Sequence, residues 1–256
     1  MLQQLLAGSL EDAATRRQQR PFAEVEAEAL ARPVALDVLE ALAPAEHIKV
    51  IAEVKRASPS RGDLAEIAEP RTLAAQYEAG GASVVSVLTE ERKFKGSLAD
   101  LEDVRKAVSI PVLRKDFIGD EYQLLEARAA GADLALLIVA ALPQATLERL
   151  YAFTRELGMT PLVETHSASE VARAVDLGSQ LIGVNARDLS TFELDRDLFG
   201  RVADQIPAGV IRVAESAVLD VADVQHYREA GADVVLVGEA LVTNDPIATL
   251  SSYLSV

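Results

Sequence analysis

The chain has 256 residues, of which half are hydrophobic, and its formal net charge is −15. This length allows one large α/β domain with a deep core. The acidity argues against binding of nucleic acid or of an anionic membrane, because both need a positively charged face. The sequence has no cysteine and only three histidines. Disulfides and thiol nucleophiles are therefore excluded, little is left for a metal site, and we expect metal-independent chemistry.

The first residues carry no signal for export. Gln3 and Gln4 interrupt the apolar start, and Glu11 and Asp12 follow it, so the core of a signal peptide is missing. The longest apolar run, residues 134–142, is too short to span a bilayer. We therefore expect a cytoplasmic protein.

Residues 1–46 are predicted to form a helical N-terminal extension. Leucines recur there at helical spacing, and Pro21, Pro33 and Pro44 interrupt the helices. We expect the extension to cap apolar surface at one end of the main domain, with a direct role in substrate binding as the alternative.

From Lys49 onward, apolar strand-like runs alternate with amphipathic helical runs, which indicates successive βα units. Eight strands are predicted, at residues 50–54, 84–88, 112–114, 134–138, 161–163, 181–184, 211–214 and 234–237. Eight helices follow them, at residues 70–79, 98–108, 121–130, 144–157, 169–177, 196–204, 221–230 and 246–253.

This alternation predicts an α/β fold, a (β/α)8 TIM barrel over residues 47–256. The strand-like runs are apolar throughout, as parallel strands are when barrel closure buries both of their faces. An open, doubly wound sheet is the alternative. It is less favoured because no G-x-G-x-x-G motif follows the first strand.

The first predicted strand ends in an acid and a base. Glu53 and Lys55 are two residues apart, so their side chains point to the same face of the strand. The Pro and Gly residues of the run from Ser58 to Gly62 then start a loop. A solvated surface pair is the simpler interpretation of Glu53 and Lys55. In a barrel, however, this position belongs to the mouth where catalytic residues gather.

Polar residues end most of the other predicted strands as well. In a barrel they would meet at one mouth, where lysines and glutamates set each other's charge states as acid–base catalysis requires. The polar residues at the strand ends are Glu53, Lys55, Ser58, Ser86, Thr89, Glu90, Lys115, Asp116, Glu164, His166, Asn185, Arg187, Asp188, Glu215, Ser216 and Glu239.

The last two strand ends are candidates for an anion-binding site. Barrels often bind phosphate with backbone N–H groups of the loops after strands seven and eight. Here these loops are residues 215–217 and 238–240. For Gly238, a role as a simple strand terminator is an equally good interpretation.

Six strings of residues resemble those of a known family. They are A-E-V-K-R-A-S-P-S at Ala52, P-V-L-R-K-D-F at Pro111, L-V-E-T-H at Leu162, G-V-N-A-R-D-L at Gly183, V-A-E-S at Val213 and V-G-E-A-L at Val237. With them the chain resembles indole-3-glycerol phosphate synthase, a barrel enzyme of tryptophan biosynthesis, from about residue 50 to residue 242. The extension before the barrel is also similar.

The resemblance implies a carboxy-lyase that works without a cofactor. It would convert 1-(2-carboxyphenylamino)-1-deoxyribulose 5-phosphate to indole-3-glycerol phosphate, carbon dioxide and water. Lys115 or Lys55 would protonate the ketose carbonyl and assist the loss of water, and their division of labour stays open. Glu164 would act as the general base.

The same resemblance implies the roles of the other site residues. Glu53 would position Lys55 and stabilise positive charge, while Glu215 and Asn185 would orient the ribulose hydroxyls. The implied substrate contacts are Ser58 with the substrate carboxylate, Arg187 with an anion, and Ser216, Ala217, Gly238 and Glu239 around the phosphate.

One position departs from the family pattern. The family usually reads E-S-G after the seventh strand, and this chain has Ala217 in place of the glycine. Alanine keeps the N–H donor but adds a Cβ, which is costly where φ is positive. We expect weaker phosphate binding with unchanged chemistry.

Two other functions are considered. A phosphosugar isomerase such as phosphoribosylanthranilate isomerase commonly needs a cysteine, which is absent. A barrel that binds a phosphate ligand without turnover would not need the complete set of Lys55, Lys115 and Glu164. Association with other enzymes of the tryptophan pathway is left open.

Overall fold

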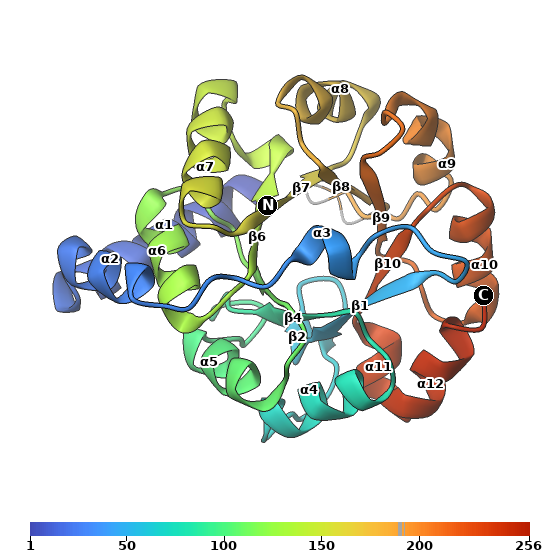
Figure 1. Cartoon of the computed structure of the whole chain (residues 1–256), viewed down its shortest axis with the longest axis horizontal. Helices are drawn as coiled ribbons and strands as arrows, with labels where there is room; N and C mark the ends of the chain where they lie inside the picture. Colours follow the sequence, from blue (N-terminus) through green and yellow to red (C-terminus); the bar gives the residue numbers. More distant parts are fainter. Residues whose placement is uncertain (189–190, 192) are drawn as a thin grey trace.

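The computed structural model describes residues 1–188, 191 and 193–256, and in this part of the chain eight parallel strands close into a barrel (Figure 1). They are β1 (Lys49–Val54), β4 (Val84–Leu88), β5 (Val112–Lys115), β6 (Leu134–Ile138), β7 (Thr160–Thr165), β8 (Leu181–Asn185), β9 (Ile211–Glu215) and β10 (Val234–Val237). Strand β1 pairs with both β4 and β10, and Ile51 faces Val84 on one side and Leu236 on the other. The TIM barrel is confirmed, and the open sheet is excluded.

Helices surround the barrel and alternate with its strands (Figure 1). They are α4 (Pro70–Ala79), α5 (Leu98–Ala107), α6 (Glu121–Ala130), α7 (Gln144–Glu156), α8 (Ala168–Asp176), α9 (Leu198–Val202), α10 (Val221–Glu229), α11 (Glu239–Thr243) and α12 (Pro246–Tyr253). The predicted helix at 196–204 is shorter than expected, and a 3-10 turn, η2 (Ala203–Gln205), follows it. The short helix α11 was not predicted as a separate element.

The core follows from the apolar strands. Every residue of β4 and of β6 is buried, as expected when one face of a strand lines the barrel interior and the other packs against helices. Local signals set where several helices begin, since Ser97, Ser167 and Asp220 each accept a hydrogen bond from a backbone N–H in the first turn. The polar strand ends therefore lie between rigid strands and capped helices.

The N-terminal extension packs on two parts of the barrel. Helix α1 (Leu2–Gln19) and helix α2 (Phe22–Leu30) lie beside α6 (Figure 1). Helix α3 (Val38–Ala41) crosses the end where the strands begin (Figure 1), and its Val38 and the following Leu42 are fully buried in the same core as the strands. The third helix therefore covers apolar surface at the amino-terminal end of the barrel. The division of the chain at residues 46 and 47 stays a prediction.

A buried polar network joins α1 to the strand that carries Lys115. Arg114 is fully buried and lies 3.0 Å from the Asp116 carboxylate, which also accepts a 2.8 Å hydrogen bond from the Ser9 hydroxyl. Arg16 of α1 binds Glu126 through two hydrogen bonds of 2.5 and 2.9 Å. Buried charged groups of this kind are tolerated only when they are paired, so the network holds the end of β5 in one conformation.

A small hairpin follows β1 and was not predicted. Strand β2 (Ala57–Ser58) pairs antiparallel with β3 (Gly62–Asp63), and Gly62 has a positive φ of 70° in this turn, which glycine adopts readily. Among the described residues, no helix is long and apolar enough to cross a membrane.

Candidate active site

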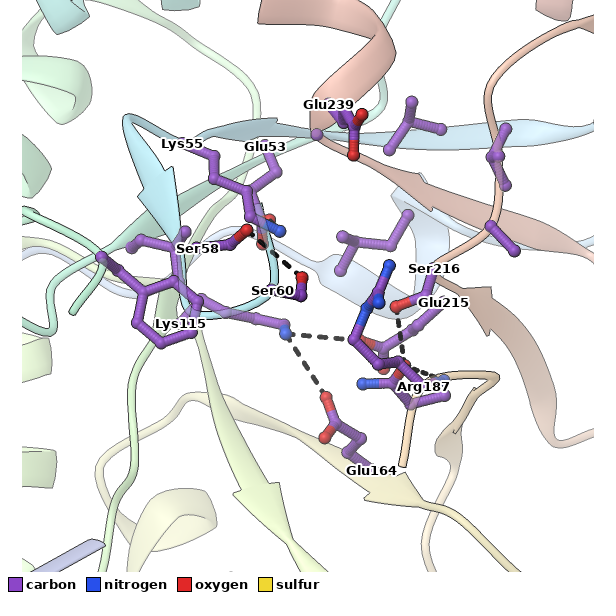
Figure 2. Close-up of a pocket in the computed structure, with 18 of the residues that line it drawn as sticks. Glu53, Lys55, Ser58, Ser60, Lys115, Glu164, Arg187, Glu215, Ser216 and Glu239 are labelled. Carbon is purple, nitrogen blue, oxygen red and sulfur yellow. Dashed lines mark hydrogen bonds and ion pairs between the residues drawn. The ribbon is translucent and has the colours of Figure 1, made fainter. Parts of the chain in front are cut away.

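A cavity of about 500 Å³ opens at the carboxyl ends of the barrel strands (Figure 2). The twelve residues to which a catalytic or binding role was assigned line it. These residues are Glu53, Lys55, Ser58, Lys115, Glu164, Asn185, Arg187, Glu215, Ser216, Ala217, Gly238 and Glu239. They come from six strand ends that are distant in sequence, and barrel closure brings them together. Five of the other polar residues at the strand ends, Ser86, Thr89, Glu90, His166 and Asp188, are not among its lining residues.

Glu53 and Lys55 point to the same side of β1, as strand alternation predicts. Lys55 Nζ lies 3.6 Å from Glu53 Oε1, and the buried Ser86 hydroxyl donates a 3.1 Å hydrogen bond to Glu53 Oε2. Glu53 is only 3% exposed, so the interpretation as a solvated surface pair is excluded. The carboxylate is held in place while the Lys55 ammonium reaches into the cavity.

Lys115 lies at the centre of the acid–base cluster (Figure 2). Its Nζ is 3.3 Å from Glu164 Oε2 and 3.5 Å from Glu215 Oε2. Burial by itself would lower the pKa of Lys115, but the carboxylates of Glu164, Glu215 and Glu53 outweigh it and raise the pKa above its ordinary value. Lys115 is therefore a cation at neutral pH.

The pKa values of the two carboxyl groups beside Lys115 are shifted in opposite directions. Burial would raise the pKa of Glu164, but the positive charges of Lys115 and His166 outweigh it and hold the pKa below its ordinary value. Burial, together with the negative charge of Glu164, raises the pKa of Glu215 well above its ordinary value. Pairs of carboxyl groups with divergent pKa values mark a base and a proton-carrying partner.

A glycine in β8 makes room for Glu215. A Cβ on Gly183 would lie 2.1 Å from Glu215 Oε1, which is closer than any non-bonded contact allows. On the same strand, Asn185 Oδ1 accepts a 2.7 Å hydrogen bond from the Ser216 hydroxyl and a 3.0 Å hydrogen bond from the Arg187 N–H. The ends of β8 and β9 therefore present their polar groups to the cavity as one unit.

The loops after β9 and β10 line the cavity, and residues 216–217 and 238–239 form its rim. Ser216 and Ala217 both have a positive φ, of 70° and 58°. A Cβ on Gly238 would lie 3.0 Å from Glu53 Oε1 and 3.3 Å from Lys55 Cδ, so the glycine permits the close approach of β10 to the Lys55 side chain. The first N–H groups of α11, which Glu239 begins, have no partner within the helix.

The β2–β3 hairpin lies beside this rim. The Ser58 and Ser60 hydroxyls are 3.5 Å apart, and both residues line the cavity (Figure 2). Arg61 Nη2 lies 2.5 Å from Glu239 Oε1. The hairpin is therefore connected to the start of α11, and the Glu239 carboxylate is paired with the hairpin.

Sequence reasoning missed the apolar wall of the cavity. The rings of Phe94 and Phe117 are 6.0 Å apart, and both residues line the cavity with Leu136 and Ile138. Phe117 belongs to the string P-V-L-R-K-D-F, in which only the charged residues were assigned a role. The signal that could have found it is an aromatic residue close behind a strand end, in a chain with only six phenylalanines.

A cluster of Lys115 with two buried carboxyl groups at the mouth of a (β/α)8 barrel defines the chain as a barrel enzyme. The family model of indole-3-glycerol phosphate synthase matches residues 2–251. The chain belongs to this family, as the resemblance of its motifs indicated.

Curated relatives agree with this assignment. The indole-3-glycerol phosphate synthase of Leifsonia xyli subsp. xyli is 68% identical over 99% of this chain and 97% of its own length. That of Beutenbergia cavernae is 56% identical over 95% of this chain and 90% of its own length. The match extends through the N-terminal extension as well as the barrel.

Solved structures at low identity show the fold alone. A thiamine phosphate pyrophosphorylase from Pyrococcus furiosus matches with a TM-score of 0.60 at 11% identity, over 80% of this chain and 93% of that one. An N-acetylmannosamine-6-phosphate 2-epimerase from Clostridium perfringens matches with a TM-score of 0.63 at 11% identity, over 83% and 94%.

Proposed function

We propose that the chain is an indole-3-glycerol phosphate synthase, which closes the ring of 1-(2-carboxyphenylamino)-1-deoxyribulose 5-phosphate with loss of carbon dioxide and water. The observation that carries this proposal is the position of Lys115. It lies between two buried carboxyl groups whose pKa values are shifted in opposite directions, in a cavity that also has an apolar wall. Family membership supplies the substrate.

The cavity matches the three parts of this substrate. The phosphate would bind at the rim formed by residues 216–217 and 238–239, where backbone N–H groups are available. The aryl ring would lie against Phe94 and Phe117, which line the cavity and offer aromatic surface for it to pack on. The ribulose between them would then pass over Lys115.

In the first step the aryl carbon that carries the carboxylate attacks the ketose carbonyl. Lys115 donates a proton to the carbonyl oxygen as the new carbon–carbon bond forms. The geometry favours Lys115 over Lys55 for this role, because Lys115 has two carboxyl groups beside it while Lys55 lies near Gly238 at the phosphate rim. Lys55, positioned by Glu53, would stabilise the bound substrate.

Ring attack leaves a positive charge on the aryl system, which the nearby carboxylates stabilise. The carbon–carboxylate bond then breaks, carbon dioxide leaves, and its electron pair restores aromaticity, so this step needs no electron-accepting cofactor. After the first step Lys115 regains a proton from solvent, and in the last step the hydroxyl leaves as water with this second proton. Glu164 takes the proton from the adjacent ring carbon, which creates the indole double bond.

The remaining residues would orient the substrate. Glu215, as a protonated carboxyl group, could donate to a ribulose hydroxyl, and Asn185 would contact a neighbouring hydroxyl. Both carboxyl oxygens of Glu215 are buried without a hydrogen bond to the described residues, which suits a group that is completed by substrate. Arg187 and Ser58 are our candidates for the substrate carboxylate.

A direct assay tests the function. Purified protein mixed with the carboxyphenylamino ribulose phosphate should produce the fluorescence of the indole product. Formation of the ketose from phosphoribosylanthranilate instead would favour the isomerase, and saturable binding without any product would favour the binding protein. Cytoplasmic location and association with another enzyme of the tryptophan pathway stay predictions.

We expect the Ala217→Gly variant to bind substrate more tightly. The positive φ at Ala217 is strained for alanine by about 1 kcal/mol relative to glycine, and its Cβ lies at the phosphate rim. The substitution should lower KM several-fold and leave kcat unchanged. Steady-state kinetics measure KM and kcat, and competitive inhibition by inorganic phosphate measures how tightly the rim binds phosphate. An unchanged KM and inhibition constant would show that the Cβ does not affect phosphate binding.

A further inference from the structure

A histidine that lies behind Glu164 has no role in the reaction described so far. The side chain of His166 is 8% exposed, and the residue is not among those that line the cavity. Its Nε2 lies 3.3 Å from Glu164 Oε1, and its Nδ1 lies 3.3 Å from Glu170 Oε2. The imidazole ring therefore connects the proposed base to a second carboxylate outside the cavity.

Glu170 is fixed in the first turn of α8. Its Oε2 accepts a 2.8 Å hydrogen bond from the His166 backbone N–H, and its Oε1 accepts a 3.2 Å hydrogen bond from the Ser167 hydroxyl. Ser167 in turn caps α8 by accepting a hydrogen bond from the Glu170 N–H. With its carboxylate held in this way, Glu170 keeps a proton on His166 Nδ1.

The arrangement determines the charge of the ring. With Nδ1 protonated, a neutral imidazole would turn the lone pair of Nε2 toward the Glu164 carboxylate, which is repulsive. An imidazolium ion instead places positive charge beside both carboxylates. Nδ1 is hydrogen-bonded to Glu170 Oε2, and Nε2 forms an ion pair with Glu164 Oε1 that does not have hydrogen-bond geometry. Burial would lower the pKa of His166, but Glu164 and Glu170 outweigh it and raise the pKa to about 10.

The acidic groups near Glu164 and His166 outnumber the single cation Lys115, which favours a positive charge on His166. Lys115 faces the opposite oxygen of Glu164, and Glu215 lies on the far side of Lys115. Glu53 adds a further negative charge to the cluster. Without a cation at His166, the three carboxyl groups would compete for Lys115, and Glu164 would take up a proton more readily.

We propose that His166 is a positioning residue, which remains an imidazolium ion between Glu164 and Glu170 and keeps Glu164 ionised and aligned as the base. Its positive charge lies beside Oε1, while Oε2 faces Lys115. This inference rests on the proposed role of Glu164 in the reaction. The acid is Lys115, and the proton on His166 is not transferred to substrate.

The charge of His166 can be measured without turnover. The chain has only three histidines, and His47 and His226 are exposed, so they serve as internal references in an NMR titration of the imidazole nitrogens. His166 should remain an imidazolium through pH 8. The Glu170→Gln variant should lower the pKa of His166 by about one to three units. A neutral His166 at pH 7 in the wild type would overturn the proposal.

Kinetics test the consequence for the base. In His166→Gln and Glu170→Gln, the acid limb of the kcat–pH profile should move up by about one to three pH units, and kcat should recover at high pH. His226→Gln is the matched control and should leave the profile unchanged. A uniform loss of kcat at every pH, with the limb in its original place, would show a merely structural role and refute the proposal.

The two tests separate this inference from the proposed function. If the chain does not turn over the ribulose phosphate, the wild-type protein is inactive while the titration of His166 still gives its result. If this inference fails while the proposed function holds, the wild type is active, but either His166 is neutral at pH 7 or the acid limb of the variants does not shift. Thermal unfolding of each variant identifies a loss of fold, and Glu170→Gln, which keeps the size of the side chain, then replaces His166→Gln.

Discussion

The Lys115→Met variant should lose turnover by roughly 10²–10⁴-fold in kcat, because it removes the general acid of ring closure. Methionine keeps the length of the side chain and fills its space. Glu164 and Glu215 lose their shared cation, but these carboxyl groups can take up a proton, so the fold should persist near neutral pH. Product fluorescence measures the activity, and circular dichroism measures the fold.

The control for this variant is Lys106→Met. Lys106 is exposed on α5 and pairs with Asp103, so its loss should leave kcat unchanged. A near-wild-type kcat in Lys115→Met would refute the assignment of the acid. The same substitution at Lys55 would then be the next test, because the resemblance to the family leaves either lysine as a candidate.

The Glu164→Gln variant should show a loss of similar size, about 10²–10⁴-fold in kcat with little change in KM. The amide has the same shape as the carboxyl group and can still accept a hydrogen bond from Lys115, so substrate binding is retained while the base is removed. The wild-type pKa of Glu164 is held below its ordinary value, so the base form persists as the pH falls. The amide of the variant cannot act as a base at any pH, so its kcat should be below that of the wild type throughout the pH profile.

Glu156→Gln provides the comparison, since Glu156 is exposed on α7 and takes no part in the cavity. If Glu164→Gln raised KM strongly and kept kcat, Glu164 would contact substrate without acting as the base. Single-turnover measurements would show which step slows, because loss of the base should delay the final loss of water and not the release of carbon dioxide.

Much of the fold could be read from local patterns. The predicted strands coincide with the observed ones to within two residues at each end, because an apolar run bounded by turn and capping residues is a local property. The pairing of Glu53 with Lys55 on one face follows from strand alternation alone. Three short elements were missed, the strands β2 and β3 of the hairpin and the helix α11, since two-residue strands and a one-turn helix carry almost no periodicity.

The composition of the site could also be predicted in large part. The twelve residues that were assigned a catalytic or binding role line the cavity, because barrel topology places all carboxyl ends of the strands at one mouth. Ser86, Thr89, Glu90 and His166 also stand at strand ends but do not line it. The apolar wall of Phe94 and Phe117 escaped notice, since an aromatic residue after a strand end is as readily assigned to the core. The cost of Ala217 depended on its backbone conformation, which only the structure gives as a positive φ.

The sequence by itself determined which residue types stand at the strand ends and that a closed barrel gathers them. Only the tertiary structure decided which of them touch. Lys115 and Glu164 are 49 residues apart and meet at 3.3 Å, and Gly183 leaves room for Glu215 in a neighbouring strand. The charge states of Glu164, Glu215 and His166 follow from these contacts and from burial. No local pattern contains them, because electrostatic coupling depends on distances that barrel closure sets.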